Sequence, residues 1–303
     1  MNQTGKLPAI FAAVVGGSFM AVQARVNSGL GQETGSGILA ALVSFSIGLL
    51  IISVATLASS KNRAALSLTF SKFKDSSIPL WLSIAGMLGG IYVIMQGVVA
   101  GLIGVALFSI GVVAGSALSA LVLDGNGLLG LTKRKIGLTR LAGTVLALSG
   151  LVVASDLANY SFSPLILLPF ASGIGIGFQQ AMNGLFGKLA QSAIVPTFFN
   201  FIAGTVFIAL ALLVVEGFSF PASWPSNPLL YLGGVVGVIF IFMQVVVLPK
   251  IGALSMGIAM LVGQLSGSVL LDLLVPIADR AVTISTLLGI VLAMLGAALV
   301  AKR

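Results

Sequence analysis

Long apolar runs, separated by short polar segments, repeat along the whole chain. A helix needs about 20 apolar residues to cross the hydrocarbon core of a membrane, and most of these runs are close to that length. Proline stands near the start of several of them, where its missing N–H costs little. The pattern predicts ten membrane-spanning helices, over residues 7–28, 36–58, 79–99, 102–123, 138–155, 164–186, 192–215, 228–248, 251–275 and 284–301.

Composition leads to the same class of protein. Hydrophobic residues make up 58% of the chain and charged residues only 7%, whereas an ordinary soluble domain has about 25% charged residues. A soluble globular protein and a disordered chain are therefore excluded. An outer-membrane barrel is excluded too, because its interior needs many more polar residues. We expect an all-α integral membrane protein.

The residue types that are missing exclude most catalytic chemistry. The chain has no His and no Cys, so it has no thiol nucleophile, no Cys-ligated metal site and no Ser-His-Asp triad. General acid–base chemistry also has few candidates, because the carboxylates are not clustered in the sequence. We expect that the protein is not an enzyme and that it has no catalytic residue, no metal and no cofactor.

The basic residues indicate the orientation in the membrane. With the N-terminus in the cytoplasm, all of the fifteen Lys and Arg residues except Arg25 and Arg280 fall on the cytoplasmic side. The positive-inside rule therefore predicts cytoplasmic N- and C-termini. The net charge of +8 is explained by this orientation, and we expect no nucleic-acid partner. The expected location is the inner (plasma) membrane of a bacterium, crossed several times.

The chain also repeats itself. Residues 23–48 match residues 179–204 at an offset of 156, residues 81–124 match 229–272 at an offset of 148, and residues 143–150 match 289–296. The matches include polar residues that are scarce in this chain, namely Gln23/Gln179, Asn27/Asn183, Gln96/Gln244 and Asp124/Asp272. We predict two five-helix repeats, residues 1–157 and residues 158–303. Because five is an odd number, the second repeat is expected to be inverted in the membrane, an arrangement typical of transporters.

The repeated strings resemble a known family. They are Gln23-x-x-x-Asn27-x-x-Leu30-Gly31, Phe45-x-x-Gly48 and Leu123-Asp124-Gly125 in the first half, and Gln179-x-x-x-Asn183, Gly187, Phe201-x-x-Gly204, Gly263-Gln264 and Leu271-Asp272 in the second. This pattern is similar to the DctA-YdcZ branch of the drug/metabolite transporter (DMT) superfamily, in its fused two-repeat form. The resemblance implies ten helices in two inverted repeats, and alternating access for small metabolites or drugs. Ser116 departs from the family's Gly-Gln pair, which the second half keeps at Gln264.

Two pairs of amides are candidate gate residues. Gln23 and Asn27 are four residues apart, so they share one helix face, and the same holds for Gln179 and Asn183. An amide that faces hydrocarbon without a partner costs several kcal/mol, so both faces should point into the bundle. Inverted symmetry would place the two pairs at opposite mouths of a central cavity, as gates. The alternative is static hydrogen bonding between helices.

Other polar residues are candidate substrate ligands. Gln264 and Asn200 lie near the middle of their predicted spans, where polar side chains are most often functional. Gln180 neighbours the Gln179 face, Ser44 is the repeat counterpart of Asn200, and Tyr92 is a candidate pocket wall. Amides both donate and accept hydrogen bonds. These residues therefore suit a polar solute that is neutral or zwitterionic.

The charged residues within or beside the spans have two interpretations each. Asp124 and Asp272 are matched carboxylates, and each is either a proton-coupling group or a structural residue that caps a turn or pairs with a cation. Arg25 either extends to the membrane surface or binds an anionic group of the substrate.

The function expected from these observations is secondary transport. The chain would move a small polar metabolite or drug-like solute across the inner membrane by alternating access. The alternative is a channel or lipid flippase built on the same inverted repeat. The expected partners are the small-molecule substrate and membrane lipids, and the expected oligomeric state is a monomer or a homodimer.

Overall fold

The computed structural model describes residues 6–131, 133, 136–154, 164–217, 219–275 and 282–301. Within these ranges the chain is helical and contains no strand, which confirms the predicted all-α class. The helices are α1 (Lys6–Thr34), α2 (Gly37–Ala58), α3 (Ser60–Lys74), α4 (Gly86–Val98), α5 (Ala100–Ile103), α6 (Val105–Asn126), α7 (Leu138–Ala154), α8 (Leu167–Ala190), α9 (Ile194–Glu216), α10 (Gly233–Leu274) and α11 (Ile284–Ala301), with short 3-10 turns η2 (Leu80–Ile84), η4 (Pro164–Ile166) and η5 (Pro228–Tyr231).

Six helical segments in the described ranges are long and apolar enough to cross a membrane. They are α1, α2, η2 with α4, α6, η4 with α8, and α9. Shorter apolar helices cover Leu138–Ala154, Ala259–Leu274 and Ile284–Leu299. These nine segments coincide with nine of the ten predicted runs, and the tenth run, 228–248, lies in η5 and the first part of α10. The number of ten spans itself stays a prediction.

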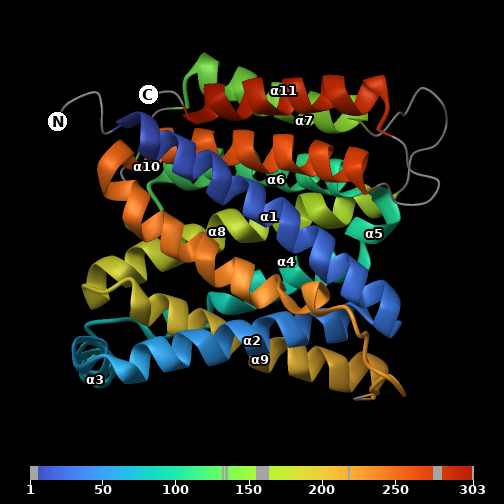
Figure 1. The fold of residues 1–303 in the computed structure, drawn as a ribbon. Coiled ribbons are helices and arrows are strands. Elements are labelled where there is room, and N and C mark those ends of the chain that lie inside the picture. Colours follow the sequence, from blue (N-terminus) through green and yellow to red (C-terminus); the bar gives the residue numbers. More distant parts are fainter. Residues whose placement is uncertain are drawn as a thin grey trace.

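Helix α10 corrects one expected boundary. The sequence predicted separate spans at 228–248 and 251–275, but α10 is one continuous helical element. Its ribbon turns back on itself in Figure 1. The first part of α10 contacts Asn27 and then Gln23, so it runs toward the start of α1. The last part contacts α1 in the opposite order, from Gly17 to Arg25. The two arms therefore run in opposite directions along α1, as two spans would, without a loop between them.

The matching region of the first half is interrupted. Here α4, α5 and α6 are separate helices, and Gly104 lies between α5 and α6 with a φ of 88°. Side chains with a Cβ rarely adopt this backbone conformation, so glycine is favoured at this position. The break lets α6 begin in a new direction, and it leaves the first amides of α6 available to a partner from another helix.

The centre of the bundle is held by contacts that the sequence repeat relates to one another. Helices α2 and α9 lie side by side at one edge of the bundle, and α7 and α11 at the opposite edge (Figure 1). The rings of Phe45 and Phe201, which are repeat counterparts, meet with their centroids 5.3 Å apart. A Cβ on Gly48 would lie 2.1 Å from the Phe201 ring, and a Cβ on Gly204 would lie 2.1 Å from the Phe45 ring. Each half therefore provides a glycine that receives the other half's aromatic ring.

Two further glycines bring backbones into direct contact. A Cβ on Gly115 of α6 would lie 2.0 Å from the carbonyl oxygen of Phe170 in α8. Its repeat counterpart Gly263 in α10 has the same relation to Val14 of α1, at 1.8 Å. Small residues allow membrane helices to approach this closely, and in the absence of a hydrophobic force between helices such packing stabilises the bundle.

Alanine at either of these glycines should destabilise the protein. Gly115→Ala and Gly263→Ala place a methyl group against a backbone carbonyl that has no side-chain freedom to move. Overpacking of this kind costs about 1–3 kcal/mol. Thermal unfolding of the detergent-purified variants measures the loss.

The matched control is Gly184→Ala. Gly184 also lies within a helix, but a Cβ there has no neighbour within 4 Å. Because alanine favours the helix by up to about 1 kcal/mol over glycine, this variant should be as stable as the parent or more so. Equal melting temperatures for all three variants would contradict the account of the packing.

Candidate functional site

A cavity lies between the two halves of the bundle. It contains about 770 Å³ of space between atoms, including its open end. Six helices contribute to its wall, namely α1, α2, α4, α8, α9 and α10. The lining residues are Met20, Gln23, Ser44, Phe45, Gly89, Tyr92, Val93, Ile176, Gln179, Gln180, Asn183, Asn200, Phe201, Gly237 and Phe240. The structure thus brings together seven of the eleven site residues predicted from the sequence.

Most of this wall consists of repeat counterparts. At the offsets of 156 and 148, twelve of the fifteen lining residues form six pairs: Met20/Ile176, Gln23/Gln179, Ser44/Asn200, Phe45/Phe201, Gly89/Gly237 and Tyr92/Phe240. A surface that two related halves build from equivalent positions lies at the interface between them. Both halves are therefore needed to form the cavity.

The second half contributes a connected chain of amides. Gln179 Nε2 donates to Asn200 Oδ1 at 3.0 Å, and Asn200 Nδ2 donates to Asn183 Oδ1 at 2.6 Å. Asn200 is buried, Gln179 and Asn183 are half-buried, and Gln180 is exposed. Because α8 carries Gln179 and Asn183 four residues apart, both reach the same amide on α9. The burial of these residues thus decreases from Asn200 outward to Gln180.

The first half has a different polar arrangement. Gln23 Nε2 donates to the carbonyl oxygen of Gly233 at 3.0 Å, which joins α1 to α10. Ser44 and Tyr92 are only 3% exposed. The Tyr92 hydroxyl lies near the Gln96 side chain one turn further along α4, but it makes no hydrogen bond among the described residues.

Two of the predicted amides lie outside the cavity wall. Asn27 is fully buried and donates from Nδ2 to Gln96 Oε1 at 2.8 Å. Gln264 is buried in the second arm of α10, with 4% exposure, and does not line the cavity. Gln264 was expected to be a substrate ligand from its position along the span, but the direction in which a side chain points depends on the rotation of the helix, which the span boundaries do not define.

Sequence reasoning also missed functional candidates. Gln96 is the partner of Asn27, and its coincidence with Gln244 in the repeat was the available signal. Phe45 and Phe201 add a pair of rings to the wall, beside Tyr92 and Phe240. Their matched positions were visible in the sequence, but in such an apolar chain an aromatic residue gives little indication of its role.

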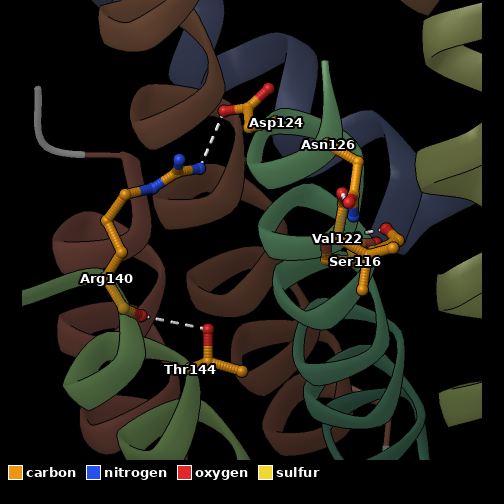
Figure 2. A network of polar contacts seen from close by, with 7 residues as sticks. Ser116, Val122, Asp124, Asn126, Arg140 and Thr144 are labelled. Carbon is orange, nitrogen blue, oxygen red and sulfur yellow. Dashed lines mark hydrogen bonds and ion pairs between the residues drawn. The ribbon is translucent and has the colours of Figure 1, made fainter. Parts of the chain in front are cut away.

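The matched carboxylates have structural contacts of two kinds. Asp272 accepts hydrogen bonds from the amides of Val105 at 3.2 Å and Ala106 at 2.7 Å, so it caps the start of α6 from another helix. Asp124 pairs with Arg140 of α7, at 2.7 Å between Oδ2 and Nη2. Figure 2 shows the Arg140 guanidinium reaching toward Asp124, while the Thr144 hydroxyl donates to the Arg140 carbonyl. Neither carboxylate lines the cavity.

Arg25 also lies outside the cavity wall. Its Nη2 donates to the carbonyl oxygen of Val275, at the end of α10, at 2.7 Å. This contact ties α1 to α10 through the backbone. The Arg25 guanidinium thus bonds at the surface of the bundle, and the Arg25 side chain does not line the cavity between the halves.

The long apolar helices define a multi-pass membrane protein. Comparison with known proteins identifies the family. The family DMT_YdcZ, described as "Putative inner membrane exporter, YdcZ", matches residues 8–153 and again residues 164–299. The chain therefore belongs to this family in a two-repeat form, as the resemblance of its repeated strings predicted.

Other comparisons give less detail. No curated protein matches the chain. A solved structure described only as "Crystal structure of protein" has 18% sequence identity and a TM-score of 0.58, and the alignment covers 99% of this chain and 96% of the other. This likeness supports the fold and carries no information on the substrate.

The contacts of Asp272 predict a measurable structural role. Asp272→Leu removes both acceptors from the first amides of α6, and a buried donor left without a partner costs about 1–3 kcal/mol. Asp272→Asn keeps one carboxamide oxygen as an acceptor, so its loss should be smaller. Thermal unfolding in detergent compares the two variants with the parent. A protein with Asp272→Leu that melts like the parent would show that the cap contributes nothing to stability.

Proposed function

We propose that this protein is a secondary transporter that moves a small polar solute across the inner membrane by alternating access through the cavity between its halves. The family supports an inner-membrane exporter. The observation that carries the proposal is the wall of the cavity, in which six repeat-related pairs face one space. A site shared by two related halves is the arrangement expected when one half rocks against the other around a bound solute.

The two ends of the cavity differ in the way that alternating access requires. Asn27 is fully buried and bonded to Gln96, while its counterpart Asn183 is half-buried and lines the cavity. Ala24 is 1% exposed, and its counterpart Gln180 is exposed. We call these the Asn27 end and the Asn183 end. At these two pairs of equivalent positions, the residue at the Asn27 end is thus buried and the residue at the Asn183 end is more exposed.

A hydrogen bond between the halves supports the same assignment. Gln23 donates to the backbone of Gly233 and so joins the first half to the second near the Asn27 end. Its counterpart Gln179 donates to Asn200, which belongs to its own half. Among the described contacts, Gln179 makes no equivalent bond across the halves, and beyond the Asn183 end the halves are joined by Lys72 Nζ, which donates to the carbonyl oxygen of Leu189 at 2.8 Å. In the opposite state the inverted halves would exchange these two arrangements, and Gln179 would bond across to α4.

The orientation follows from the basic residues. Lys188 lies just over one helical turn beyond Asn183, and it belongs to the set that the positive-inside rule assigns to the cytoplasm. With both termini cytoplasmic, the proposal assigns the Asn183 end to the cytoplasmic side and the Asn27 end to the outer side.

A channel or lipid flippase is the second candidate function. A channel needs a path that is open at both ends, and the buried Asn27–Gln96 pair closes one end. A flippase would move a lipid headgroup along the surface of the bundle, without using the interior amides. The sealed end and the interior position of the amide chain both favour a transporter over these alternatives.

Cysteine accessibility tests the proposal without background, because the chain has no native cysteine. Gln180→Cys and Ala24→Cys occupy repeat-matched positions at the two ends. In membranes, Gln180→Cys should react rapidly with a maleimide applied from the cytoplasmic side, whereas Ala24→Cys should react slowly from either side. Ala13→Cys, at a fully buried packing position, is the unreactive control. Equal and rapid reaction of both sites would contradict alternating access and favour a channel.

A second variant separates gating from static bonding. Asn183→Leu removes the amide at the Asn183 end of the three-amide chain but leaves Gln179 and Asn200 bonded to each other. Transport in proteoliposomes should fall by at least about tenfold, the factor that corresponds to 1.4 kcal/mol. Full transport by a well-folded Asn183→Leu protein would show that this amide has only a packing role.

A further inference from the structure

We propose that the cavity selects solutes that carry no net charge and that combine a flat apolar face with a group that both donates and accepts hydrogen bonds. This inference rests on the proposed transport function and adds the chemical class of the solute. Three features of the wall carry it: the absence of charged side chains, the two ends of the amide chain, and the aromatic pair.

No acidic or basic side chain is among the described lining residues. The two matched carboxylates are engaged elsewhere, Asp272 by backbone amides and Asp124 by Arg140. A charged solute would therefore exchange its water shell for amides, hydroxyls and rings without meeting a counter-ion. Burying an unpaired charge is far more costly than burying a neutral polar group that finds its hydrogen bonds.

The amide chain of the second half offers one donor and one acceptor. Within the chain, Asn200 is satisfied on both sides by Gln179 and Asn183. Among the described contacts, this leaves the Oε1 of Gln179 as an acceptor and the Nδ2 of Asn183 as a donor. If all three amides were rotated by 180°, Gln179 would offer the donor and Asn183 the acceptor, so one donor and one acceptor would still remain. A solute group with a donor beside an acceptor, such as a carboxamide, complements this wall.

The apolar part of the wall is largely aromatic. Phe45 and Phe201 meet at an angle of 54° where the halves join, and Phe240 lies on the first arm of α10. Pairs of aromatic rings prefer offset or tilted contacts, which add stabilisation beyond that of the buried area. A flat ring on the solute would contact this pair while its polar group reaches the amide chain, so the two parts of the wall recognise the two parts of one molecule.

Matched probes that differ in one group test the inference on the full-length protein. The neutral probes are benzamide and nicotinamide, and their charged partners at pH 7 are benzoate, nicotinate and benzylammonium. Acetamide provides the polar group without a ring. Isothermal titration and thermal unfolding of the detergent-purified protein should show the neutral aromatic amides binding at least about tenfold more tightly than their charged partners and than acetamide.

Variants locate the binding site. Asn200→Leu breaks the centre of the amide chain and should abolish the preference for benzamide, while Asn200→Ser, which copies the counterpart Ser44, should retain part of it. Asn126→Ala is the matched control, because among the described contacts the Asn126 amide bonds within its own helix, to Val122 at 2.8 Å, and it does not line the cavity.

Two results would overturn the inference. One is binding of benzoate or benzylammonium as tight as that of benzamide, and the other is a failure of both neutral aromatic amides to bind. The cysteine accessibility of Gln180→Cys and Ala24→Cys is measured without any solute. It therefore reports separately on whether the transporter proposal stands when the solute class is wrong.

Discussion

A polar side chain inside a membrane protein has no water to bond with, so it must find its partner within the bundle. In a chain that is 58% hydrophobic, this constraint gathers the few amides in the core. Gln179 and Asn183 both bond to Asn200, Asn27 bonds to Gln96, and Gln23 bonds to a backbone carbonyl. The rest of the arrangement depends on these bonds, because they define which helix faces point inward and where a polar cavity can exist.

Close helix packing is the second requirement. Glycines such as Gly115 and Gly263 let backbones touch, and Gly48 and Gly204 each receive the aromatic ring of the opposite half. Because these contacts are equivalent, the same packing arrangement occurs in both halves of the chain. The polar contacts are not equivalent, because Gln23 bonds across the halves and Gln179 bonds within its own. The bundle thus combines a shared packing framework with two different arrangements of its amides, which suits a protein with two alternating states.

Much of this could be predicted from the sequence, for physical reasons. Apolar runs of membrane length correctly located the helices, and scarce polar matches at constant offsets revealed the repeat, which the two matches of the family confirm. Spacing by four residues correctly placed Gln179 and Asn183 on one face. Other features depend on three-dimensional packing. The rotation of α10 turns Gln264 away from the cavity, and the continuity of α10 removed an expected loop. The partners of Asp124 and Asp272 lie on other helices, at positions that no local pattern specifies.

In the proposed mechanism, the two ends of the cavity open and close in opposite senses. Spin labels at Glu33 and Ser226 span the halves at the Asn27 end, and labels at Ser77 and Gln191 span them at the Asn183 end; all four residues are exposed. Electron–electron resonance distances should be measured for both pairs in the parent and in Gln23→Leu, which removes the bond to Gly233. In this variant the first distance should lengthen while the second shortens. If the first distance lengthens alone, or both distances lengthen together, the ends are not coupled and alternating access is contradicted.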